Sequence, residues 1–272
     1  MIHISLAAEK LFSLGDWTIT NSFLTSLVAS IAIIALFGTA ARRVTLHPTG
    51  KFAQSIESII EAILGLIEQV THDRAKARQW FPLLATLFIF IVVNNWFGLL
   101  PVLGSIFVRT PEGAVPLFRG ANADLNTTLA LALISVVATQ AYAIKTLGLF
   151  RHLSKYFSFN PMLLFIGFIE LISEVSKMIS FSFRLFGNIF AGEVLLAVIS
   201  SLLPLIGPLP FLAFELFVGL VQALVFTLLT LVFLDTATTD HKAGNGHAST
   251  PALHESKTHA MAAIPLVEPQ PS

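Results

Sequence analysis

The sequence contains no cysteine, which excludes disulfide bonds, thiolate metal sites and iron–sulfur clusters. It also contains little charge: Asp, Glu, Lys and Arg together make up 12% of the 272 residues, and their formal charges cancel. A chain without net charge exerts no bulk attraction on nucleic acid, so no nucleic-acid partner is expected. Because no nucleotide-binding motif occurs either, the sequence predicts no bound cofactor.

Apolar residues are abundant instead. They make up 55% of the chain and gather in charge-free runs dominated by leucine, isoleucine and phenylalanine. Runs of about 20 such residues are long enough to cross a bilayer as helices. The alternation of apolar and polar residues that a transmembrane barrel needs is absent from them. The composition therefore predicts an all-α polytopic membrane protein surrounded by a lipid bilayer.

Five transmembrane helices are expected. They cover Trp17 to Ala41, Trp80 to Val108, Leu125 to Ile144, Asn160 to about Leu203, and Phe211 to Leu234. A continuous fourth helix would be roughly 66 Å long, about twice the thickness of a hydrocarbon core, so it must be steeply tilted or broken. Proline and glycine between residues 204 and 210 make the turn into the fifth helix, so the last two form a long tilted hairpin. Residues 1 to 16 are expected to form a short interfacial helix or a loose arm.

One further helix, from Gln54 to Val70, is amphipathic: isoleucine and leucine recur at helical spacing and glutamates lie elsewhere. Basic residues flank it, which favours an interfacial helix along the cytoplasmic surface; a soluble helix that packs on a partner is the alternative. Lys and Arg concentrate at 42 to 78 and at 145 to 155. The positive-inside rule then places the loop at 109 to 124 and the N-terminus outside, and the C-terminus in the cytoplasm.

The chain divides into a membrane domain, residues 1 to 240, and a tail, residues 241 to 272. Thr, Ala, Gly, Ser, Pro and His dominate the tail without periodicity, which predicts disorder. Its histidines could bind a metal, but their irregular spacing and the lack of other ligands favour a solvated tail. No metal site is therefore predicted.

The most unusual segment, Ser180 to Glu193, places an arginine among long apolar runs. An arginine near mid-membrane costs at least about 2.5 to 3.5 kcal/mol, so Arg184 is a functional hypothesis. In a helix, Gly187, Asn188 and Ala191 share its face, and such a stripe of small residues lets another helix approach closely. The alternative is an arginine that snorkels from a helix end.

Other polar groups lie along the same two helices and in the second span. Glu170 and Glu174 precede Arg184 on its cytoplasmic side, and Glu193 follows it toward the outside. Intramembrane groups of this kind tend to relay protons or ions. In the second span, Asn95 can line water or contact a neighbour's polar group, with plain interhelical hydrogen bonding as the alternative.

The hairpin brings further groups toward this segment. Glu215 and Gln222, seven residues apart, share one face of the last helix, so Glu215 is expected to approach Glu193 and Gln222 to approach Arg184. Two neighbouring, partly desolvated carboxylates suit a group that takes and gives protons. The alternative is two acids solvated independently near the hairpin end.

The segment resembles the arginine segment of the membrane-embedded a subunit of F-type ATP synthases, where the pattern is Ser-x-x-x-Arg-Leu-Phe-Gly-Asn-x-x-Ala-Gly-Glu. Ser180 opens that pattern here, Arg184 and Asn188 hold its arginine and asparagine, and Glu193 closes it. In that family the last helix carries a glutamine beside the arginine. Seven residues earlier it carries a polar residue that pairs with the glutamate, often a histidine.

Further positions agree with the resemblance, which covers about residues 20 to 240. Gln222 and Glu215 hold the two places in the last helix, and Glu170 holds that of a cytoplasmic-side glutamate. The run Asp124-Leu-Asn-Thr-Thr is similar to the family's Asp-x-Asn-x-Thr.

The resemblance implies a non-catalytic stator subunit with two proton half-channels. Protons would pass Asn95 or Asp124, then Glu193 and Glu215, protonate a ring of c subunits, and leave past Glu170 and Glu174, with Arg184 between the two routes. The implied partners are the c-subunit ring, the peripheral stalk b subunits and the remaining ATP synthase subunits. A bacterial inner membrane is expected because no transit peptide is recognised, with an organelle-encoded copy as the alternative. The alternatives are a secondary transporter that binds an anionic substrate through Arg184, although no internal repeat is found, and a structural scaffold.

Overall fold

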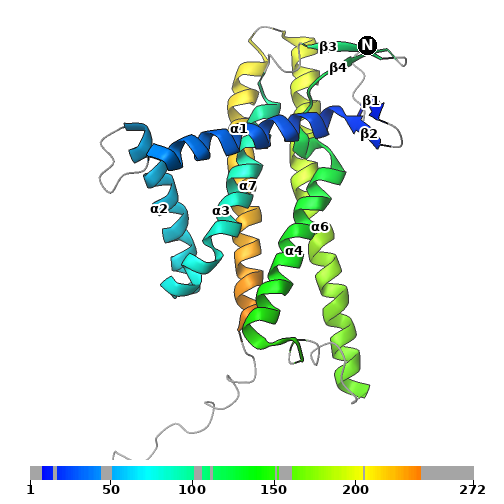
Figure 1. Cartoon of the computed structure of the whole chain (residues 1–272). Helices are drawn as coiled ribbons and strands as arrows, with labels where there is room; N and C mark the ends of the chain where they lie inside the picture. The colour runs from blue at the N-terminus through cyan, green and yellow to red at the C-terminus, as the bar shows by residue number, and fades with distance from the viewer. Residues whose placement is uncertain are drawn as a thin grey trace, which may run out of the picture. The chain divides into compact units, whose positions relative to one another are not determined.

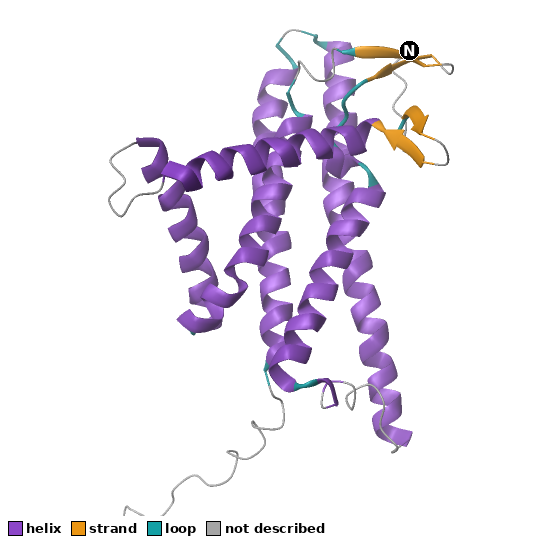
Figure 2. Ribbon diagram, in the orientation of Figure 1, coloured by secondary structure: helices purple, strands orange, loops and turns teal. Residues whose placement is uncertain are grey.

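The computed structural model describes residues 8–14, 17–43, 51–100, 106–110, 113–150, 152, 161–204 and 206–239. Its main helices are α1 (Asn21–Arg43), α2 (Lys51–Thr71), α3 (Arg74–Gly98), α4 (Leu125–Leu147), α6 (Pro161–Leu202) and α7 (Pro208–Thr238). All of them except α2 are long and apolar enough to cross a membrane. The prediction of an all-α polytopic membrane protein with five spans is confirmed (Figures 1 and 2).

Short elements join these helices. Strands β1 (Lys10–Leu14) and β2 (Trp17–Thr20) form one antiparallel hairpin, and β3 (Phe107–Thr110) and β4 (Gly113–Pro116) form another. A short 3-10 helix, η2 (Ala121–Ala123), precedes α4 and is fully buried against α1, α3, α4 and α6. The expectations for residues 1–7 and for the tail from 241 lie outside the described residues.

The N-terminal expectation was wrong in one respect. Lys10–Leu14 and Trp17–Thr20 pair as antiparallel strands, so this part of the chain is neither a helix nor a loose arm, and Trp17 lies in β2 and not in the first span. Helix α1 begins at Asn21 because the Thr20 hydroxyl accepts a hydrogen bond from the Phe23 N–H (3.3 Å), as an N-cap residue does. Apolar content alone does not mark that boundary.

The second span was also placed too far along the chain, since it was expected from Trp80 to Val108. Helix α3 begins at Arg74, where the Asp73 carboxylate accepts hydrogen bonds from two backbone N–H groups of the first turn, and ends at Gly98. There Gly98 meets Gly120 so closely that a Cβ on Gly98 would lie 2.8 Å from the Gly120 Cα. Phe107 and Val108, which the sequence analysis included in this span, belong to strand β3.

Helix α2 is the expected amphipathic helix, and the C-terminal half of its apolar side packs inside this chain, whereas Ile59 and Ile60 are exposed. Ile67 is completely buried in a cluster with Trp80 and Leu84 of α3 and with Leu231 and Leu234 of α7. The glutamates at 57 and 61 are exposed on the other side. The buried face of α2 therefore covers part of the helix bundle.

Helix α6 is continuous over 42 residues, about 63 Å at about 1.5 Å per residue. The broken-helix alternative is thus wrong. Figure 1 shows α1 crossing the long helices instead of running alongside them. If α1, at about 35 Å, spans a hydrocarbon core of about 30 Å, then α6 must be strongly tilted in the bilayer.

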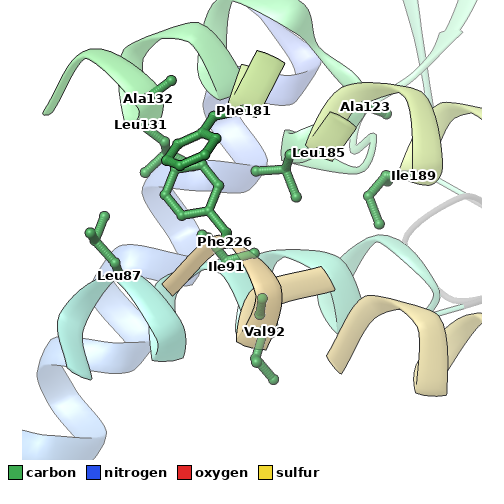
Figure 3. Close-up of a cluster of buried hydrophobic side chains, with 11 residues drawn as sticks. Leu87, Ile91, Val92, Ala123, Leu131, Ala132, Phe181, Leu185, Ile189 and Phe226 are labelled. Atoms are coloured by element: carbon green, nitrogen blue, oxygen red, sulfur yellow. The ribbon is translucent and has the colours of Figure 1, made fainter. Parts of the chain in front are cut away.

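The main hydrophobic core lies between α3, α4, α6 and α7 (Figure 3). Helix α6 contributes Phe181, Leu185 and Ile189, which are spaced four residues apart and are all buried. The Phe181 ring packs on Phe226 of α7, with 5.2 Å between the ring centroids. Because these three apolar side chains point into the core, the side of α6 that carries Arg184 points away from the core.

Candidate functional site

An exposed polar stripe runs along α6. It consists of Ser180, Arg184, Gly187, Asn188 and Ala191, all of which are exposed. Arg184 forms no hydrogen bond or ion pair with any residue that the structure describes, and a Cβ on Gly187 would meet nothing within 4 Å. The stripe is therefore an open surface of small side chains around one guanidinium, as the helical spacing predicts.

Gln222 of α7 joins this stripe through Asn188. The Asn188 side-chain amide donates to Gln222 Oε1 at 2.6 Å, and Gln222 is buried. The expectation placed Gln222 beside Arg184, whereas the hydrogen bond that the structure shows is to the residue one helical turn later. The bond holds α7 against α6 at the turn that follows the arginine.

Glu193 forms an ion pair that the sequence reasoning missed. Its Oε2 atom lies 3.3 Å from Nε of Arg119, and both side chains are largely buried. The backbone N–H of Gly120 also donates to this carboxylate. The sequence contained one signal of this pair. Arg119 is a basic residue in a loop assigned to the outside, where the positive-inside rule expects few basic residues, so an acidic partner for it could have been sought.

Glu215 lies beside Glu193 at the hairpin end. It is buried, and its carboxyl group packs so closely over Gly192 that a Cβ at Gly192 would collide with it. No residue in the described part of the chain donates a hydrogen bond to Glu215 Oε1. The two carboxylates are close enough for their charges to interact, so the hairpin brings them together as its turn suggests.

Asp124 caps a helix and lines a cavity. One of its carboxylate oxygens accepts from the Asn126 N–H (3.0 Å) at the start of α4, and the other accepts from the Ser22 hydroxyl (2.7 Å) of α1. The cavity beside it has a volume of about 540 Å³ and is also lined by Thr20 and Asn126. Asp124 is therefore anchored in place and lies on the wall of this cavity, whose lining is mostly apolar.

Asn95 makes the plain interhelical hydrogen bonds that were its alternative role. Its Nδ2 donates to the carbonyl of Gly219 in α7 (2.9 Å), and its Oδ1 accepts from Asn122 of η2 (2.7 Å). Asn95 is buried. It therefore connects α3, η2 and α7.

Replacing Asn95 with alanine is expected to lower the free energy of unfolding by about 1 to 3 kcal/mol, because α3 loses its hydrogen bond to the Gly219 carbonyl and the buried Asn122 amide keeps only its longer bond to the Ile91 carbonyl (3.4 Å). Thermal inactivation of the purified protein in lipid measures the effect. Asn94→Ala is the matched control, since the Asn94 amide donates only within its own helix, to Phe90 (2.8 Å). Equal losses for the two variants would contradict the interhelical role.

The N-terminal half of α6 carries the other predicted acids. Glu174 Oε1 lies 2.7 Å from Nζ of Lys177, whose ammonium group is 4.7 Å from the ring centroid of Phe233 in α7. Glu170 lies one turn earlier and is partly buried. These acids and Glu193 therefore lie on opposite sides of Arg184 along one helix, about 21 Å before it for Glu170 and about 14 Å after it for Glu193.

Known proteins resemble this chain over most of its length. Residues 23–235 match the family described as ATP synthase A chain. ATP synthase subunit a 2 of Bradyrhizobium sp. strain BTAi1 is 34% identical over 234 residues, which cover 85% of this chain and 95% of that protein. ATP synthase subunit a 1 of Crocosphaera subtropica is 36% identical over 203 residues, 74% of this chain and 80% of that protein.

These similarities do not favour the secondary-transporter alternative, because the matches extend over nearly all the spans. The expected a-subunit resemblance is confirmed, and with it a place in a multi-subunit complex of the membrane. The chain is a multi-pass membrane protein and belongs to the ATP synthase A chain family.

Proposed function

We propose that this chain is the stator subunit of a rotary ATP synthase membrane sector. It provides two proton half-channels to and from a ring of c subunits and couples proton flow to ATP synthesis. The observation that carries the proposal is the exposed guanidinium of Arg184 on a stripe of small residues, with acids on both sides of it along α6. ATP chemistry then belongs to other subunits, and this chain is non-catalytic.

The outer half-channel starts from the side of the β-hairpins. Protons reach it through the cavity beside Asp124, pass Glu193 and Glu215, and bind a carboxylate on the adjacent ring. We favour access past Asp124 over access past Asn95, because both polar atoms of the Asn95 amide are engaged in buried hydrogen bonds. Ser180 and Asn188 then face the ring on either side of the arginine.

The inner half-channel leads past Glu174 and Glu170 to the cytoplasm. A proton that has travelled nearly a full turn on the ring leaves by this route. Arg184 separates the two half-channels, because its guanidinium is always charged and attracts each deprotonated ring carboxylate. A proton cannot pass that fixed positive charge directly, so transport must turn the ring.

We also propose partner subunits and a membrane orientation for this chain. The partners are the c ring, the b subunits of a peripheral stalk and the remaining ATP synthase subunits. The N-terminus lies outside a bacterial inner membrane and the C-terminus lies in the cytoplasm, in accordance with the positive charges at residues 42 to 78 and 145 to 155.

The absence of native cysteine allows a direct test by disulfide cross-linking. A single cysteine at Gly187, where a larger side chain meets open space, is expected to cross-link to a cysteine on the outer helix of a c subunit in the assembled complex. Cross-linked product on a denaturing gel measures the contact. Ile34→Cys is the control, since Ile34 of α1 is 71% exposed but lies on a helix away from the stripe. Absence of product from Gly187→Cys, or equal product from Ile34→Cys, would contradict the assignment of this face to the ring.

A further inference from the structure

Arg119 is buried although it lies in a connecting segment. Only 10% of its side chain is exposed, and the residue is held at two points by different helices. Its backbone N–H donates to the Thr25 hydroxyl of α1 (3.1 Å), and its Nε donates to Glu193 Oε2 of α6 (3.3 Å). A charge removed from water costs several kcal/mol unless it is paired, so this burial depends on Glu193.

The backbone around Arg119 leaves the guanidinium little room to move. Gly120 packs against Gly98 of α3, and a Cβ on Gly120 would lie 2.9 Å from Glu193 Oε1. The next three residues form the buried η2. Arg119 therefore approaches Glu193 from a rigid support and not from a loose loop.

The two neighbouring carboxylates are consequently in different situations. Glu193 accepts hydrogen bonds from Nε of Arg119 and from the Gly120 N–H. Glu215 Oε1 accepts none from the described residues, although the residue is buried. An oxygen that already accepts a hydrogen bond from a guanidinium has that lone pair occupied, whereas the free oxygen of Glu215 can bind an arriving proton.

We propose that Arg119 is a positioning residue of the outer half-channel: it holds the Glu193 carboxylate against Gly120, so that Glu215 is the group that carries the proton to the ring. In one transfer, an O–H bond forms at Glu215 with a proton from the outer water. That bond then breaks as the proton moves to the ring carboxylate. Throughout this transfer Glu193 stays a carboxylate paired with the Arg119 guanidinium, and neither group gains or loses a proton. This inference rests on the proposed function.

The test uses the complete complex reconstituted in vesicles and measures ATP-driven proton pumping per assembled complex. Misplacing a reacting group by about 1 Å costs about a hundredfold in rate, so Arg119→Gln should slow pumping roughly ten- to a hundredfold. Arg119→Lys keeps the charge and should recover part of that loss. Arg109→Gln is the matched control, because Arg109 is an exposed arginine of the same outer segment, on β3. Pumping by Arg119→Gln at the rate of Arg109→Gln would overturn the proposal.

The double variant Arg119→Gln with Glu193→Gln separates positioning from an independent role. If Arg119 acts only through Glu193, the double variant should pump no more slowly than Glu193→Gln alone. A rate reduced by the product of the two single effects would overturn the proposal. Where Arg119→Gln does not assemble, the double variant, which leaves no unpaired charge, should still assemble; its failure would show that Arg119 serves folding alone.

The failure of this inference can be told apart from failure of the proposed function. Coupled ATP synthesis that survives Arg184→Ala would contradict the stator assignment itself. Loss of synthesis in Arg184→Ala, together with multiplicative effects at Arg119 and Glu193, would contradict only the positioning role.

Discussion

Replacing Arg184 with alanine is expected to abolish gradient-driven ATP synthesis in reconstituted vesicles and to raise the passive proton leak. The guanidinium is the one fixed charge on the exposed stripe of α6, and nothing in the described part of the chain neutralises it. Removing a single preorganised electrostatic group commonly costs about 10²- to 10³-fold in rate. Each charge that crosses 100 mV carries about 2.3 kcal/mol, so a path that bypasses rotation wastes the gradient.

Two variants make this result specific to position. Arg78→Ala removes an exposed arginine near the start of α3 and should leave synthesis near the unchanged level. Arg184→Lys keeps a positive charge but loses the planar donor group, so we expect a rate between those of alanine and arginine. Luciferin–luciferase detection of ATP and a pH-sensitive dye for the leak measure both quantities. Undiminished coupled synthesis in Arg184→Ala would end the stator proposal.

The second large effect is expected from Glu215→Gln. Glutamine preserves the shape of this buried side chain over Gly192 but cannot take and give a proton. A positioned acid–base group contributes about 10²- to 10⁴-fold to a proton transfer, so proton uptake from the outside should slow by about a hundredfold or more. ATP synthesis driven by an imposed pH gradient measures the loss.

Glu61→Gln is the control for this change, because Glu61 is an exposed glutamate of α2, remote from the hairpin end. We expect it to leave synthesis unaffected. Glu193→Gln should also slow uptake, since it removes the partner of Arg119. Normal synthesis rates in both Glu215→Gln and Glu193→Gln would remove the acidic pair from the proton route.

Much of the fold was predictable because the solvent is a bilayer. Long charge-free runs must form helices there, since unpaired backbone groups cannot be hydrated in hydrocarbon. Helix α4 begins at Leu125 as expected, where Asp124 caps its first turn. The start of α1 and the end of α3 were misplaced because the charge-free stretches continue beyond these helices into β2 and β3. Local hydrogen bonds, such as that from the Phe23 N–H to the Thr20 hydroxyl, mark where a helix begins.

Within the site, residues that share one helix were easier to anticipate than pairs that join separate elements. The period of the helix places Arg184 and Asn188 on one face, and the α6–α7 turn brings Glu215 toward Glu193. The hydrogen-bond partner of Gln222 depends on how α6 and α7 pack side by side, so the sequence did not identify Asn188 as that partner.

By itself the sequence determined a polytopic helical membrane protein, its amphipathic α2 and an arginine stripe along one face of α6, because hydrophobicity and helical period are local properties. Tertiary structure alone decided that Arg119 meets Glu193 and that Glu215 Oε1 accepts no hydrogen bond from the described residues. The physical reason is distance along the chain: Arg119 and Glu193 are 74 positions apart, and the surroundings of Glu215 come from several elements at once. Close packing between elements, such as that of Gly98 on Gly120, determines both.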